Sequence, residues 1–258
     1  MQDLFSLAGR TALVTGGSRG IGRMIAAGFL AQGARVYISA RKAEACEQAA
    51  RELSAHSGGR QCIALPADVA TLAGAQALAA TFQALEPGLD ILVNNAGAAW
   101  GAPLADFPEN GWDKVVDTNP KAPFFLTQAL LPALRAAASA QRPAKVINIA
   151  SIDGISVNPL ETYSYAASKA GLIQLTRRLA LTLVKDHVVV SAIAPGAFAS
   201  DMNRAARDEA DATAARIPAG RIGRDDDMAG AAIYLAARAG DYVVGSTLVV
   251  DGGVTHAR

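Results

Sequence analysis

The chain has 258 residues, of which 51% are hydrophobic and 18% charged, and its 24 basic and 23 acidic side chains leave a net charge of +1. This length allows one large α/β domain or two small ones, and the composition excludes extensive disorder. The charge balance, without a basic run or an aromatic-rich basic patch, argues against nucleic-acid binding.

The sequence shows no targeting, membrane or metal-binding signal. Met1–Phe5 lacks a basic region and a long apolar stretch, so no signal peptide is expected. No run reaches about 18 apolar residues, so no membrane span is expected. Cys46 and Cys62 fit no metal spacing, and the three histidines lie in unrelated contexts, so no metal site is predicted. Two isolated thiols indicate a reduced, cytoplasmic protein.

Short β-branched runs alternate with helical stretches along the whole chain. This alternation predicts right-handed βαβ units and a doubly wound, Rossmann-type α/β fold, with about seven parallel strands and helices on both faces. No linker or repeat interrupts it, so residues 1–258 are predicted to form one domain. The expected strands are Thr11–Thr15, Arg35–Ala40, Gln61–Pro66, Asp90–Asn94, Lys145–Ala150, Val188–Ala194 and Ser246–Val250. The expected helices cover about 20–32, 42–56, 71–85, 111–137, 163–185 and 225–239.

The first helix is preceded by a glycine-rich turn. Gly16, Gly20 and Gly22 lie between the first strand and this helix. Their missing side chains let backbone N–H groups approach a phosphate, and the helix N-terminus favours negative charge. The alternative is a tight strand–helix connection that binds nothing.

The end of the second strand indicates which dinucleotide binds. An acidic residue there would bind the ribose 2′-hydroxyl of NAD, but the sequence reads Ser39-Ala40-Arg41. Arg41 and Arg19 can both pair with a 2′-phosphate, which favours NADP(H). The alternative for Arg41 is a solvated helix start.

The remaining polar candidates also follow strands. Asn94–Gly97 follows the fourth strand, Ser151 the fifth and Pro195-Gly196 the sixth. Ligands of doubly wound sheets bind outside these carboxyl ends, so a single site is predicted. The segment of about 197–220 carries no strand pattern and is either a mobile lid or an ordinary surface helix and loop.

Tyr165 and Lys169 are spaced to share one face of a helix. A lysine ammonium beside a phenol lowers its pKa, which gives a proton donor suited to carbonyl chemistry. Ser151 can donate a hydrogen bond to a carbonyl oxygen. Taken alone, the pair is an ordinary surface helix pair and the serine a turn residue. Tyr163 lacks a lysine partner and is expected in a pocket wall or the core.

Together these motifs resemble the short-chain dehydrogenase/reductase family over nearly the whole chain. The resemblance implies that Asn119, Ser151, Tyr165 and Lys169 are catalytic, with Asn119 holding a proton-relay water. It also implies cofactor contacts along the turn, the strand ends and the segment over the nicotinamide. These contacts come from Gly16, Ser18, Arg19, Gly20, Ile21, Gly22, Arg41, Asp68, Val69, Asn95, Ala96, Gly97, Tyr165, Lys169, Pro195, Gly196, Phe198 and Ser200.

Within the family, the chain is most similar to bacterial NADPH-dependent β-ketoacyl reductases of the rhamnolipid-associated type. The stretches that carry this similarity are Phe5–Arg10, Ala98–Gly101 and Ile217–Arg221. The implied substrate is a ketone or secondary alcohol, with a 3-oxoacyl thioester favoured. A homotetramer or homodimer built on the helices near 111–137 and 163–185 is also implied.

Three positions depart from the family pattern. Pro120 follows Asn119 and lacks an N–H, which puts the relay water in question. Asp153 either faces the pocket and selects a polar or cationic substrate group, or is a loop carboxylate in water. Lys185-Asp186-His187 is of mixed charge, which argues against docking of an acyl carrier protein.

Other functions remain open from the sequence. A reductase or dehydrogenase of another ketone or alcohol (steroid, sugar or xenobiotic) uses the same motifs. A non-catalytic NADP-binding sensor would need only the cofactor site. Gly16–Gly20 also fits the Gly-x-Ser-x-Gly elbow of hydrolases, with Ser18 as nucleophile and His256 as base, but it follows the wrong strand.

Overall fold

The computed structural model describes residues 4–257, and its seven strands form one parallel sheet in the order β3-β2-β1-β4-β5-β6-β7. The chain runs outward from β1 to β3, then returns to the middle and runs outward from β4 to β7. This order confirms the expected doubly wound α/β fold. The strands are β1 (Thr11–Thr15), β2 (Arg35–Ser39), β3 (Cys62–Ala64), β4 (Ile91–Asn94), β5 (Ala144–Ile149), β6 (Val188–Pro195) and β7 (Thr247–Val250).

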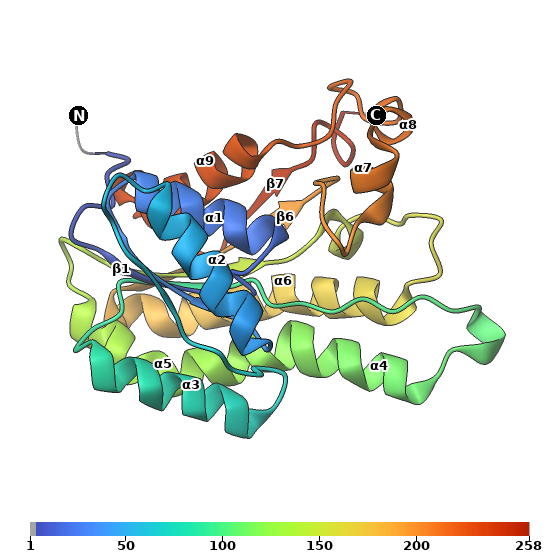
Figure 1. Ribbon diagram of the computed structural model, residues 1–258. Coiled ribbons are helices and arrows are strands. Elements are labelled where there is room, and N and C mark those ends of the chain that lie inside the picture. The colour runs from blue at the N-terminus through green and yellow to red at the C-terminus, as the bar shows by residue number, and fades with distance from the viewer. Residues whose placement is uncertain (1–3, 258) are drawn as a thin grey trace.

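Helices cover both faces of the sheet (Figure 1). One layer holds α1 (Gly20–Ala31), α2 (Ala43–Ala55) and α9 (Asp225–Ala236), and the other holds α3 (Leu72–Leu85), α4 (Glu109–Val116), α5 (Ala122–Ala137) and α6 (Tyr163–Leu183). Each layer has its own apolar core. In β1, Ala12 and Val14 pack into the first core and Leu13 into the second, because successive strand residues face opposite sides.

The expected helix over about 111–137 is present, with a change of helical pitch partway along it. The helix starts at Glu109, and a wide π-helical turn at Asp117–Lys121 separates α4 from α5. Pro120 lies inside this turn. Proline has no N–H to donate and clashes with a regular preceding turn, so a local change of helical pitch accommodates it. Asn119, beside it, is 1% exposed.

The segment after β6 forms two one-turn helices, α7 (Arg204–Asp208) and α8 (Ala210–Ala214), on the side of the molecule where β6 and β7 end (Figure 1). A bridge between Phe198 and Gly223 ties its two ends together. A side chain at Gly20 would lie 3.2 Å from Ser200 Cβ, so the start of the segment passes close to the glycine turn.

Among residues 4–257, no helix is long and apolar enough to cross a bilayer. The same residues contain no group of three or more metal-ligating side chains.

Candidate active site

The glycine turn is held by the loop that follows β4. Asn95 Nδ2 donates to the carbonyls of Thr15 (2.8 Å) and Gly16 (3.2 Å), and Thr15 Oγ1 accepts from the backbone N–H groups of Asn95 and Ala96 (both 3.0 Å). Gly16 has a φ of +66°, and a Cβ there would lie 2.7 Å from Asn95 Nδ2. Glycine is therefore required at this position by both conformation and space.

The turn delivers the N-terminus of α1 to the edge of the sheet. Arg19 is the N-cap residue, and no side chain caps the first turn of the helix. That turn contains no acidic residue. Its backbone N–H groups and the helix dipole are suited to a phosphate group, so the turn fits a dinucleotide.

Two arginines lie near this end of α1. Arg41 is exposed just after β2, and it forms no ion pair with any of residues 4–257. The side chain of Arg19 is 71% exposed and pairs with Asp201 at 2.6 Å. Asp201 belongs to the segment after β6, so Arg19 links that segment to the glycine turn, a contact that sequence reasoning missed.

The other expected cofactor residues occupy neighbouring strand ends. Asp68 is exposed beyond β3 and accepts from Ala70 N–H (3.1 Å), while Val69 is buried. Gly196 N–H donates to Val250 O (2.9 Å), and a Cβ at Gly196 would lie 2.6 Å from Asp251 Cβ.

Three expected cofactor residues have side chains that pack or form hydrogen bonds within the protein. Ile21 packs partly against the core, and Ser200 Oγ accepts from Asn203 N–H (3.1 Å). The Phe198 side chain is 2% exposed and lies against Gly223 in the core. Phe198 is therefore placed to act through its backbone and not through its ring.

Asn119 connects the wide turn to α6. Its Oδ1 accepts from Ala98 N–H (2.8 Å), and its Nδ2 donates to Ala98 O (3.0 Å) and to Ser168 Oγ (2.9 Å). Ser168 Oγ in turn donates to the carbonyl of Tyr165 (2.8 Å). Sequence reasoning missed Ser168; its position between Tyr165 and Lys169, on the helix face turned inward, was the available signal.

Tyr165, Lys169 and Ser151 come together at the ends of β5 and α6. Lys169 is 4% exposed, donates from Nζ to Ile149 O (2.7 Å) and lies 5.6 Å from the centroid of the Tyr165 ring. Ser151 is 7% exposed and hydrogen-bonds the Tyr165 side chain. The expected grouping of these three side chains is therefore present.

The expected lowering of the tyrosine pKa is not found in the structure. Burial raises the pKa of Tyr165 to about 12, and the charge of Asp153 raises it further, against the lowering effect of the Ser151 hydrogen bond. Burial lowers the pKa of Lys169 to about 8, opposed by Asp153. Tyr165 is thus a neutral phenol at neutral pH, and Lys169 still carries its proton.

A third feature that sequence reasoning missed is a buried polar chain beneath the strand ends. Asn94 Nδ2 donates to Thr127 Oγ1 (3.2 Å) and Asn148 Oδ1 (2.9 Å). Asn148 Nδ2 then donates to Thr176 Oγ1 (2.9 Å). The chain joins β4, β5, α5 and α6 and fixes their relative positions.

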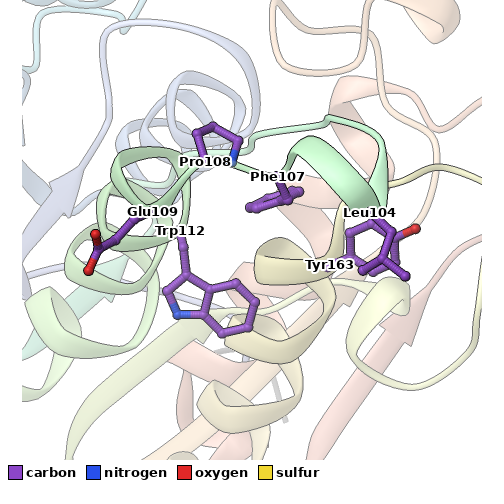
Figure 2. Close-up of a pocket in the computed structure, with 6 residues that line it drawn as sticks. All are labelled: Leu104, Phe107, Pro108, Glu109, Trp112 and Tyr163. Atoms are coloured by element: carbon purple, nitrogen blue, oxygen red, sulfur yellow. The ribbon is translucent and has the colours of Figure 1, made fainter.

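An apolar pocket of about 310 Å³ lies beside the N-termini of α4 and α6 (Figure 2). Phe107 meets Tyr163 and Trp112 edge to face, with centroids 5.7 and 6.3 Å away. Tyr163 therefore forms a pocket wall, one of its two expected positions. Leu104, Pro108 and Glu109 complete the lining.

Comparisons with known proteins agree with this geometry. The family model for short chain dehydrogenase matches residues 10–211. The rhamnolipids biosynthesis 3-oxoacyl-[acyl-carrier-protein] reductase of Pseudomonas aeruginosa is 52% identical over 98% of this chain and 99% of its own. The 5-keto-D-gluconate 5-reductase of Escherichia coli is 36% identical over the full length of both chains. The solved Pseudomonas aeruginosa RhlG/NADP active-site complex superposes with a TM-score of 0.94 at 52% identity, covering 99% of this chain and 100% of that chain.

Proposed function

Because the chain belongs to the short chain dehydrogenase family, we propose that it is an NADP(H)-dependent oxidoreductase that reduces 3-oxoacyl thioesters. The convergence of Ser151, Tyr165 and Lys169 at the ends of β5 and α6 carries the proposal. The 52% identical reductase and the NADP complex support the substrate class and the cofactor. We assign residues 1–258 to one catalytic domain.

The chain's own residues fit this cofactor. The uncapped N-terminus of α1 would hold the pyrophosphate, and Arg41 and Arg19 would hold the 2′-phosphate. Bound NADPH supplies the hydride, while Ser151 and Tyr165 bind the ketone oxygen. Tyr165 donates its phenolic proton, because its raised pKa keeps the phenol protonated until negative charge develops on that oxygen.

Lys169 and Asn119 serve the proton that Tyr165 gives up. The Lys169 ammonium lies against the tyrosine ring and stabilises the phenolate that forms. Asn119 holds the wide turn to the loop after β4 and, through Ser168, to α6. The side chain of Asn119 thus positions the wide turn, and the proposed water relay behind Lys169 rests on the resemblance to the family.

The first test follows the loss of NADPH absorbance with acetoacetyl-CoA in the wild type, Tyr165→Phe and Tyr163→Phe. Removing one proton donor costs about 10²–10⁴-fold in turnover, so Tyr165→Phe should lose at least 100-fold while binding NADPH normally. Tyr163→Phe is the matched control, since it loses a hydroxyl from the neighbouring pocket. Near-normal turnover in Tyr165→Phe contradicts the assignment.

The finer parts of the proposal concern assembly and location. Trp112 (42% exposed), Phe124 (36%) and Leu181 (68%) present apolar surface on α4, α5 and α6, which supports a homodimer or homotetramer built on these helices. Light scattering after gel filtration tests this, and a monomer at micromolar concentration contradicts it. The two buried free thiols support a cytoplasmic location.

The surface at the end of α6 bears on whether the acyl group is carried by CoA or by acyl carrier protein. At the end of α6, Arg135 pairs with Asp186 at 2.8 Å, so the acidic residue neutralises part of the basic surface there. We therefore propose acyl-CoA, with its small mobile carrier, as the better substrate in a direct comparison with the same acyl group on acyl carrier protein.

A further inference from the structure

A short turn places Asp153 between Ser151 and Lys169. Ser151 caps the 3-10 turn Ile152–Gly154, and its Oγ accepts from the Asp153 N–H at 3.1 Å. Gly154 lies flat on α6: a Cβ there would come within 2.6 Å of the carbonyl carbon of Lys169. Asp153 is therefore fixed beside the reacting groups by contacts on both of its sides.

The carboxylate of Asp153 is half-buried and uncommitted. Between residues 4 and 257 it takes part in no hydrogen bond or ion pair. The turn holds this carboxylate next to the backbone of Lys169, and its charge raises the pKa of both Tyr165 and Lys169. Together with the contact of Gly154 on Lys169, this favours the alternative in which Asp153 faces the pocket over that of a loop carboxylate in water.

The loop that continues from Asp153 is apolar at its surface. Ile155, Val157 and Leu160 are 42%, 101% and 67% exposed. A chain of CH₂ groups gains from covering such side chains, whereas a polyhydroxylated acid does not. The turn thus places one negative charge beside the reacting groups, and the loop that follows it presents an apolar surface.

We propose that Asp153 is a specificity-determining residue that rejects ketones bearing a negative charge next to the reacting carbonyl. The inference rests on the proposed ketone reduction at Tyr165. Lys169 alone would attract a carboxylate, and Asp153 cancels that attraction and repels the anion in a partly desolvated site. Neutral 3-oxoacyl thioesters and esters are accepted, and 3-oxo acids and 2-oxo acids are disfavoured.

Matched substrate pairs test the rejection directly. We would measure kcat/KM with NADPH for acetoacetate and ethyl acetoacetate, and for pyruvate and ethyl pyruvate, in the wild type, Asp153→Asn and Asp153→Glu. Each pair differs in charge beside one ketone. A change in Tyr165 affects both members and cancels in the ester-to-acid ratio, whereas a loss of positive charge on Lys169 would raise the ratio, opposite to the expected fall.

The ratio is expected to exceed about 10 in the wild type and to fall about tenfold in Asp153→Asn, equivalent to about 1.4 kcal/mol. Asp153→Glu should keep most of the discrimination. An unchanged ratio in Asp153→Asn overturns the inference, as does a wild type that prefers acetoacetate to the ester. Calorimetric binding of each pair to the NADPH-loaded protein should show the same ratio of affinities, so slow turnover does not remove the test.

A different result would contradict the proposed substrate class. Reduction of ethyl pyruvate but not of ethyl acetoacetate or acetoacetyl-CoA would discard the 3-oxoacyl class. The pyruvate pair would still decide whether Asp153 recognises charge.

Discussion

Asn95 binds the glycine turn through its side chain: Nδ2 donates to the carbonyl of Thr15 at 2.8 Å and to that of Gly16 at 3.2 Å. These bonds join the ends of β1 and β4, the adjacent central strands between which the direction of winding reverses. The proposed cofactor cradle is therefore a product of two loops about 80 residues apart.

Asn95→Ala should weaken NADPH binding by about tenfold and lower the free energy of unfolding by about 1–3 kcal/mol, because two carbonyls lose their donor. Fluorescence titration with NADPH and urea unfolding measure the two effects. Asn110→Ala, on the exposed face of α4, is the control. Equal behaviour of the two variants would show that the glycine turn holds its shape without Asn95.

Arg41→Ala should reduce the preference for NADPH over NADH by about tenfold or more, because an arginine–phosphate pair is a strong, charge-assisted contact. The measurement is kcat/KM with each cofactor. Arg51→Ala, exposed on α2, removes the same charge further from the strand ends. A preference that survives in Arg41→Ala would assign the 2′-phosphate to Arg19 alone.

Ser168→Ala should lower turnover by about three- to tenfold, because Asn119 loses its bond to α6 and the wide turn loosens. NADPH affinity is expected to change less than turnover. Ser164, also fully buried on α6 but without a hydrogen-bond partner for its hydroxyl among the described residues, provides the control Ser164→Ala. The relay proposal loses its support if the two variants have equal turnover.

Lys169→Met should change how stability depends on pH. Burial lowers the pKa of Lys169 from 10.5 to about 8, so between these values the unfolded chain binds more protons than the folded one. The wild type should therefore gain stability relative to Lys169→Met as pH rises, on the order of 2–3 kcal/mol between pH 7 and pH 10.

Urea unfolding of both proteins across that pH range measures the difference. Lys185→Met, which removes an exposed lysine at the end of α6, should run parallel to the wild type. A Lys169→Met curve that is also parallel would mean that the ammonium is not buried as the structure shows.

The sequence by itself determined the fold and the residues that form the candidate site. Hydrophobic periodicity separated strands from helices, since side chains alternate along a strand and recur every three to four residues on a helix. The sequence predicted the glycine turn, Ser151, Tyr165 and Lys169 as site residues, because the proposed chemistry requires these residue types at this spacing.

Only the tertiary structure decided how those residues act on one another. Burial is a property of packed elements, and it reverses the expected direction of the Tyr165 pKa. The Asn119–Ser168 and Asn94–Asn148 hydrogen bonds join residues that lie tens of positions apart in the sequence and on different elements. No local sequence pattern therefore predicts them. The sequence left Asp153 as either a pocket residue or a solvated loop residue, and only the contact of Gly154 with α6 shows that its turn packs against Lys169. Electrostatic effects depend on distance and desolvation, and both are set by packing between segments that are distant in the chain.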